Sequence, residues 1–189
     1  VLLAAYLIAF GNFMIFLNQY TYITFVLAAA PYHLSTHALG MLFLTYLGGT
    51  VTSAISGRVA QHIPAPLGMA LGIVLLMLGT LLTLNQHLSL IIFGFLISSF
   101  GFFFTHSLAS SWVSHHAIKA RASASSLYLV FYYLGASAGG LLLAPFWQWQ
   151  GWQGIVLCSL LVYSLTMLCS GWLYWWQKQP KKTSLYKII

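Results

Sequence analysis

The stretch Ser123-Ala-Ser-Ser-Leu-Tyr-Leu-Val-Phe-Tyr-Tyr-Leu-Gly-Ala-Ser-Ala-Gly-Gly140 decides the fold, and the basic turn His115-His-Ala-Ile-Lys-Ala-Arg121 precedes it. In a helix, the small-xxx-small pair Gly135 and Gly139 lets a second helix approach closely in lipid. Tyrosine hydroxyls inside a membrane need water, a partner helix or a ligand. The stretch therefore predicts a membrane helix with one packed or wet face. That face carries, at helical spacing, Ser125, Tyr128, Tyr132, Gly135 and Gly139.

The composition assigns the whole chain to the membrane. Hydrophobic residues make up 60% of it and charged residues 4%, with seven Lys and Arg and no Asp or Glu. So apolar a chain predicts a polytopic membrane protein in contact with the lipid bilayer. The basic residues are too scattered for a phosphate-binding patch, so we expect no nucleic-acid partner. The chain begins at Val1 inside an apolar run, which we interpret as part of a longer protein.

Six apolar segments are long enough to cross the roughly 30 Å hydrocarbon core of a bilayer. Polar or proline-containing turns separate them, and Ser35 is expected to cap the second segment. The predicted fold is an all-α transmembrane six-helix bundle over residues 1–177, followed by a cytoplasmic basic tail at residues 178–189. The predicted spans are residues 2–30, 37–59, 67–84, 88–113, 122–146 and 154–176.

The basic residues predict the orientation of the bundle. They follow the second, fourth and sixth spans, and the turns between these positions contain none. We therefore expect an integral, multi-pass protein of the plasma (inner) membrane with its C-terminus in the cytoplasm. The residues concerned are Arg58, Lys119, Arg121, Lys178, Lys181, Lys182 and Lys187.

The first span carries several uncharged polar side chains, among them Asn12, Asn18, Gln19 and Tyr22. Such groups are costly in a bilayer unless they have partners. One hypothesis is that they form a cavity wall that binds a substrate through hydrogen bonds. The alternative is that they hydrogen-bond to neighbouring helices and hold the bundle together.

His106 is the one histidine well inside a predicted span. It could carry protons, because an ordinary imidazole titrates near physiological pH. The alternative is a neutral hydrogen-bonding partner of another helix. The other histidines lie in loops or at span ends, without ligand spacing in a shielded site. We therefore expect neither a metal site nor a cofactor.

Two patterns of small residues have competing interpretations. Gly135-Ala-Ser137-Ala-Gly139 matches the G-x-S-x-G pattern of a nucleophilic serine, but that pattern belongs to a strand–turn–helix context. An intramembrane serine hydrolase is therefore only a minor alternative to close helix packing. In the second span, Gly49, Ser53 and Gly57 follow one another at i+4 spacing. This ridge permits packing or sliding against a neighbour.

The loop after the second span resembles a signature of the major facilitator superfamily of transporters, G-x-x-x-D-R-x-G-R-R. Gly57 matches its first glycine and Arg58 follows, whereas Gln61 and His62 stand at its acidic and first basic positions. Pro64, Ala65 and Pro66 occupy the last positions of the pattern. Most charged positions of the signature are therefore occupied by uncharged residues in this chain. In this respect the loop is similar to the weaker copy of the signature that lies in the second half of such proteins.

Two further stretches resemble the C-terminal half of efflux-type members of this superfamily. One is Tyr22-Ile-Thr-Phe followed by Pro31-Tyr-His-Leu-Ser35, and the other is residues 124–135 with Gly139-Gly140 and Gly151-Trp152. The resemblance covers essentially the whole chain. It implies helices seven to twelve of a twelve-helix transporter, built as a 3+3 inverted repeat, with a missing N-terminal six-span partner.

The resemblance implies a secondary transporter that moves a small solute by alternating access. The implied direction of transport is efflux, and the proton is a candidate coupling ion. We expect no enzyme activity; the alternative is a truncated, non-transporting membrane scaffold. The gating loop and packing positions would be Gly49, Ser53, Gly57, Arg58, Gly135 and Gly139. The substrate cavity would be lined by Asn12, Asn18, Gln19, Tyr22, Tyr46, His106, Tyr128 and Tyr132.

Overall fold

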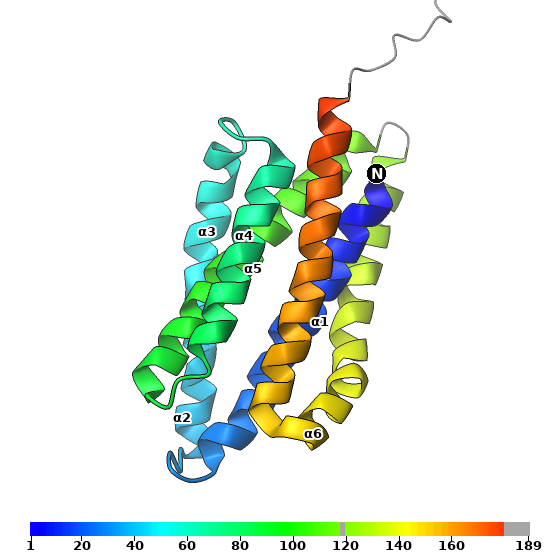
Figure 1. Ribbon diagram of the computed structural model, residues 1–189. Coiled ribbons are helices and arrows are strands. Elements are labelled where there is room, and N and C mark those ends of the chain that lie inside the picture. The colour runs from blue at the N-terminus through cyan, green and yellow to red at the C-terminus, as the bar shows by residue number, and fades with distance from the viewer. Residues whose placement is uncertain (118–119, 180–189) are drawn as a thin grey trace, which may run out of the picture.

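The computed structural model describes residues 1–117 and 120–179, which form helices and, within those ranges, no strand (Figure 1). Five helical segments there are long and apolar enough to cross a membrane, α2, η1 and α3 being one continuous segment. The prediction of an all-α, multi-pass membrane fold is therefore confirmed. The elements are α1 (Leu2–Ala28), α2 (Thr36–Met41), the 3-10 helix η1 (Leu42–Tyr46), α3 (Leu47–Val59), α4 (Ala65–Leu82), α5 (Leu88–His116) and α6 (Arg121–Lys178).

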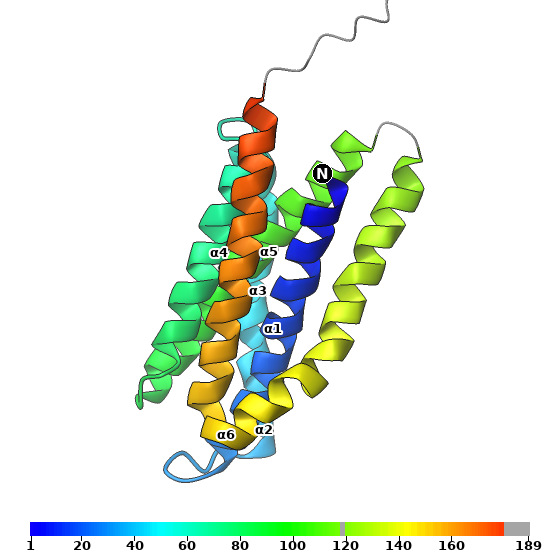
Figure 2. The ribbon, with the colours of Figure 1, turned by 45° about the vertical axis from the view of Figure 1, so that its right-hand side comes forward.

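The long helix α6 is bent back on itself. Its 58 residues are helical except at Gln150 and Gly151, where the backbone leaves the helical region. Gly151 has φ +55°, a conformation that glycine adopts at no steric cost. Figures 1 and 2 show the chain turning back at this bend, and we name residues 121–149 the first arm and residues 152–178 the second arm.

The bend of α6 makes six helical rods out of five segments. The sequence predicts a turn over residues 147–152, but the observed break is shorter. Trp147 and Trp149 continue the helix, and only Gln150 and Gly151 depart from helical geometry. The six membrane crossings with the predicted boundaries, and the internal repeat, stay predictions.

The second predicted span, residues 37–59, is not one uniform α-helix. Ser35 caps α2 as predicted, its hydroxyl accepting a hydrogen bond from the Ala38 N–H at 3.3 Å. The chain then winds more tightly through η1, between glycines that favour helix poorly. The Thr45 hydroxyl donates to the Leu42 carbonyl three residues earlier, at 2.7 Å, which suits the 3-10 geometry.

Helix α1 is the centre of the packing. It contacts α6 most extensively and also packs on α5, while α4 pairs with α5. Figure 2 shows α1 between the two arms of α6 and the other helices. Its side chains Ile15, Phe16 and Tyr20 are almost completely buried. The Tyr20 hydroxyl bonds to Thr45 of η1 at 2.6 Å and to Ser99 of α5 at 3.0 Å.

The first arm of α6 crosses α1 at glycines. A Cβ atom at Gly135 would collide with the Phe10 backbone, and one at Gly139 would collide with the Met14 carbonyl and the Asn18 side chain. The absence of side chains at these two positions therefore allows the close contact of α1 with the first arm.

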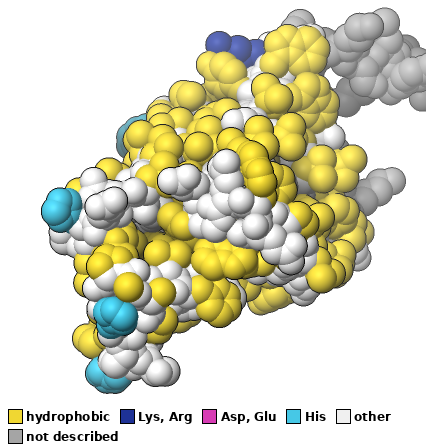
Figure 3. Space-filling model, turned by 60° about the horizontal axis from the view of Figure 1, so that its bottom comes forward, with side chains coloured by type: hydrophobic (Ala, Val, Ile, Leu, Met, Phe, Trp, Pro, Cys, Tyr) yellow, Lys and Arg dark blue, Asp and Glu magenta, His cyan; other side chains and the backbone are white. Residues whose placement is uncertain are grey.

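The two ends of the bundle differ in charge. Among the described residues, Arg58 in the last turn of α3, Arg121 at the start of α6 and Lys178 at its end share one end of the bundle, the upper end in Figure 1. Figure 3 brings the opposite end forward, where histidine side chains project from a largely hydrophobic surface. The predicted cations Lys119, Lys181, Lys182 and Lys187, with most of the predicted tail, lie outside the described residues.

We predict that Gly139→Ala lowers the thermal stability of the protein, because the added methyl group must push α1 away from the first arm. Overpacking of this kind costs about 1–3 kcal/mol. The measurement is the unfolding midpoint of the purified protein in detergent. Gly171→Ala is the matched control, since a Cβ there meets nothing within 4 Å. Equal midpoints for the two variants would contradict the close crossing.

Candidate functional site

Two polar side chains of α1 form hydrogen bonds to the first arm of α6. Asn18 donates to the Met14 carbonyl at 2.9 Å and to the Ala136 carbonyl of the first arm at 3.0 Å. The Tyr22 hydroxyl donates to the Gly140 carbonyl at 3.1 Å. Both side chains are buried where α1 packs on the first arm.

Gln19 joins three rods deep in the bundle. Its Nε2 donates to the Thr80 hydroxyl of α4 at 3.0 Å and to the Ser159 hydroxyl of the second arm at 2.8 Å. The Gln19 side chain is 1% exposed. For Asn18, Gln19 and Tyr22 the geometry therefore favours interhelical hydrogen bonding over a cavity wall.

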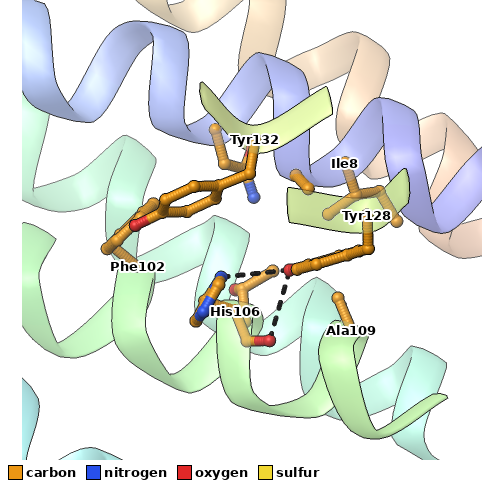
Figure 4. A pocket seen from close by; sticks show the side chains of 9 residues that line it. Ile8, Phe102, His106, Ala109, Tyr128 and Tyr132 are labelled. Atoms are coloured by element: carbon orange, nitrogen blue, oxygen red, sulfur yellow. Dashed lines mark hydrogen bonds between the residues drawn. The ribbon is translucent and has the colours of Figure 1, made fainter. Parts of the chain in front are cut away.

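Four of the predicted site residues do converge on one small cavity between α1, α5 and the first arm (Figure 4). Its volume is about 10 Å³. Sequence spacing alone could not bring these residues together, because they come from three separate helices. They are Asn12, His106, Tyr128 and Tyr132, and the lining is completed by Ile8, Ala9, Phe102, Thr105 and Ala109.

His106 and Tyr128 form a hydrogen-bonded pair in this cavity. The Tyr128 hydroxyl lies 3.0 Å from His106 Nδ1 and donates to the His106 carbonyl at 3.4 Å, as the dashed lines in Figure 4 show. Tyr128 is 1% exposed, whereas the His106 side chain is half-buried. The imidazole therefore has one partnered nitrogen inside the bundle and remains partly open to its surroundings.

Asn12 lines the cavity from α1. Its Oδ1 accepts a hydrogen bond from the Thr166 hydroxyl of the second arm at 2.8 Å. Its Nδ2 is buried and has no hydrogen-bond partner among the described residues. A buried donor without a partner is unusual enough in a folded protein to need an explanation.

Aromatic rings continue the wall beyond the cavity. Tyr132 stacks on Phe13 of α1 with ring centroids 3.7 Å apart, and the His106 ring lies 4.7 Å from Tyr132. Tyr46 lies further along, with its ring 6.0 Å from that of Phe103. Phe13, Tyr46, Phe103, His106 and Tyr132 are all half-buried, and we call this set the aromatic wall.

Sequence reasoning missed the phenylalanines of the aromatic wall and of the cavity lining. A signal was present for Phe102 and Phe103, which precede His106 by four and three residues and so share its side of α5. Phe13 had no comparable signal, because its neighbour Tyr132 is on another helix.

The predicted ridge of α3 splits into a buried and an open part. A Cβ atom at Gly49 would collide with the Phe103 ring, so this glycine packs inside the bundle. Ser53, Gly57 and Arg58 are exposed, and nothing lies within 4 Å of a Cβ built at Gly57.

The serine of the G-x-S-x-G pattern lies within the first arm of α6. The Ser137 hydroxyl donates to the Tyr133 carbonyl one turn earlier, at 3.1 Å, and the side chain is exposed. His106, the histidine inside the bundle, is paired with Tyr128. The strand–turn–helix context of a nucleophilic serine is not present at this position.

Comparison with known proteins places these observations in a family. The model of the Major Facilitator Superfamily matches residues 8–187. YybF of Bacillus subtilis (strain 168), described as an uncharacterized MFS-type transporter, is 35% identical over 163 residues, which are 86% of this chain and 40% of that protein. YnfM of Escherichia coli (strain K12), described as an inner membrane transport protein, is 37% identical over 153 residues, 81% of this chain and 37% of that protein.

A third relative is an uncharacterized transporter of Buchnera aphidicola subsp. Schizaphis graminum (strain Sg). It is 35% identical over 169 residues, which are 89% of this chain and 41% of that protein. The chain thus spans about two fifths of the length of the curated relatives it matches.

We predict that Gln19→Leu destabilises the bundle by about 1 kcal/mol, the size of a typical hydrogen bond between membrane helices. Transport per folded molecule should be retained, because Gln19 contacts Thr80 and Ser159 inside the bundle. The measurements are the unfolding midpoint and solute flux of the full-length protein. Gln153→Leu, at an exposed amide, is the control. Lost flux with an unchanged midpoint would instead support the cavity hypothesis for Gln19.

Proposed function

Because this chain belongs to the major facilitator superfamily, we propose that it forms the C-terminal half of a secondary active transporter. The transporter moves a small solute across the membrane by alternating access. Matches that cover about two fifths of each relative support the proposal of a half. On this proposal the rods form two inverted triplets: α1, α2–α3 and α4, then α5 and the two arms of α6.

The aromatic wall is the observation that carries the proposal. An imidazole and two tyrosines that remain half-buried at membrane depth suit a face turned toward water or a solute rather than toward lipid. None of the five residues of the wall is a Lys, Arg, Asp or Glu, and the described cations Arg58, Arg121 and Lys178 lie at the end of the bundle. A neutral or amphipathic small solute therefore fits it, held by ring contacts and hydrogen bonds.

The partner that would complete the cavity is the N-terminal half, a second bundle of six spans. The α2–η1–α3 segment is the least buried of the candidate membrane spans. Ser53 and Gly57 of α3 are open to such a partner, which supports a role for this ridge in contacts between the halves.

The proposed direction of transport is efflux, coupled to protons. These 189 residues contain no Asp or Glu, so a carboxylate that exchanges the coupling proton would lie in the other half. The proposed location is the plasma (inner) membrane, with Arg58, Arg121 and Lys178 on the cytoplasmic side together with the C-terminus.

A second candidate function is that of a non-transporting membrane scaffold. It is favoured by Asn18, Gln19 and Tyr22, whose polar groups are used within the bundle. The two candidate functions make different predictions for the aromatic wall. A transporter needs these side chains for transport, whereas a scaffold does not.

We predict that Tyr132→Ala in the full-length protein reduces solute transport by roughly tenfold, the effect of losing a ring contact worth about 1–2 kcal/mol. The measurement is the initial rate of flux in proteoliposomes, normalised to folded protein. Leu165→Ala is the control, because Leu165 is 63% exposed and outside the wall. Equal rates for both variants and the unmodified protein would favour the scaffold.

We predict that a protonophore slows efflux, because collapse of the pH gradient removes the driving force for proton-coupled export. The measurement is the rate of dye or solute efflux from cells that make the full-length protein, before and after addition of the protonophore. Efflux that continues unchanged would rule out the hypothesis of proton coupling and would leave the hypothesis of transport standing.

A further inference from the structure

A groove lies between the two arms of α6 and α1, away from the aromatic wall, and we call it the arm groove. It is lined by residues between Leu7 and Met14 of α1, by Leu142 of the first arm and by residues between Val162 and Cys169 of the second arm. Figure 2 shows α1 between the two arms. The volume of the groove is about 490 Å³, which is within the range of small-molecule sites.

The lining of the arm groove is almost entirely apolar. Thr166 is the one lining residue with a hydroxyl, and that hydroxyl donates to Asn12 at 2.8 Å inside the bundle. The Thr166 methyl group lies toward Gly11, where it would meet an added Cβ atom. A polar solute would therefore lose hydrogen bonds on entering the groove, whereas a hydrocarbon chain would lose none.

The arm groove is open to the hydrocarbon core of the bilayer. Leu142 and Leu168 at its rim are exposed, Leu168 to 69%, and both belong to a helix that is apolar enough to cross a membrane. Apolar cavities stay free of water, and an empty groove would forfeit packing contacts along its walls. Acyl chains of the surrounding lipid are therefore the material that fits it. The ridge that we assign to contacts with the N-terminal half is on another rod, α3.

The two arms that flank the groove carry cations at one end of the bundle. Arg121 begins the first arm and Lys178 ends the second, and both side chains are exposed at the upper end in Figure 1. No acidic side chain of the chain competes for them, because these 189 residues contain no Asp or Glu. One Lys or Arg near a membrane surface strengthens attraction to anionic lipid about fivefold.

We propose that the arm groove binds an acyl chain of an anionic phospholipid whose headgroup is held at the Arg121 and Lys178 end. At about 1.5 Å per residue, Cys169 and Val162 lie about 13 and 24 Å along the second arm from Lys178. One leaflet with its headgroups is about 20–22 Å thick, half of the whole bilayer. A headgroup beside Lys178 therefore places the far part of its chains at the groove. The proposal goes beyond transport and holds equally for a scaffold.

The test is photo-crosslinking in liposomes that contain the full-length protein. Two probes carry the same diazirine at the end of one acyl chain, one on phosphatidylglycerol and one on phosphatidylcholine, at equal mole fraction in phosphatidylcholine. Mass spectrometry locates the crosslinks. We expect the anionic probe to label the groove stretches of α1 and the second arm several-fold more than the neutral probe does, and both to label the exposed leucines of α4 equally.

Two results would overturn the proposal. Equal labelling of the groove by both probes would identify ordinary boundary lipid without selection of a headgroup. Absence of labelling from the groove, with α4 labelled, would assign the groove to another occupant, such as a solute.

Two pairs of variants separate the headgroup from the chain. Arg121→Gln combined with Lys178→Gln should lower labelling by the anionic probe to the level of the neutral one, whereas Arg58→Gln, at the same end but on α3, should preserve the difference. Leu7→Trp fills the groove and should reduce its labelling several-fold, and Leu71→Trp, at an exposed leucine of α4, is the control. Unchanged selectivity in the double Gln variant, with an unchanged unfolding midpoint, would contradict the headgroup site.

Discussion

Lipid offers no hydrogen-bond partners, so the polar side chains of α1 must find theirs inside the bundle. Asn18 reaches the first arm of α6, Gln19 reaches α4 and the second arm, and Tyr20 reaches η1 and α5. Every other rod therefore has a polar contact with this one helix. The glycines of the first arm act with these bonds, because only a close crossing brings the Ala136 carbonyl within reach of Asn18. The arrangement of the bundle depends on that set of contacts.

Much of the fold was predictable from residue types and spacing. Apolar segments separated by polar turns predict an all-helical fold, which the described residues show, and the hydroxyl of Ser35 caps α2 as its position suggests. The break at η1 was not predictable, because it depends on a Thr45 hydroxyl bond and on packing of Tyr20 against that segment. The short bend of α6 was also not predictable, because the three tryptophans near it suggest a longer turn at the membrane interface.

The candidate site was predictable only in part, for a physical reason. An amide in a membrane helix satisfies the same sequence pattern whether its partner is a solute or another helix. Only the fold distinguishes Gln19, enclosed by two hydroxyls, from Asn12, whose Nδ2 has no hydrogen-bond partner among the described residues. The aromatic wall shows the same limit: Phe13 and Tyr132 are far apart in sequence, and their stacking results from the crossing of α1 with the first arm.

The short 3-10 segment has a mechanical consequence for the helix that follows it. A 3-10 helix rises about 2.0 Å per residue with three residues per turn, against 1.5 Å and 3.6 for an α-helix. Rewinding the five residues of η1 as α-helix would draw α3 toward α2 by about 2.5 Å and rotate it by about 100°. Such a change is a screw motion along the helix axis and needs no tilt. Because α3 carries Gly49 against Phe103, the motion would change which side of α3 faces the aromatic wall.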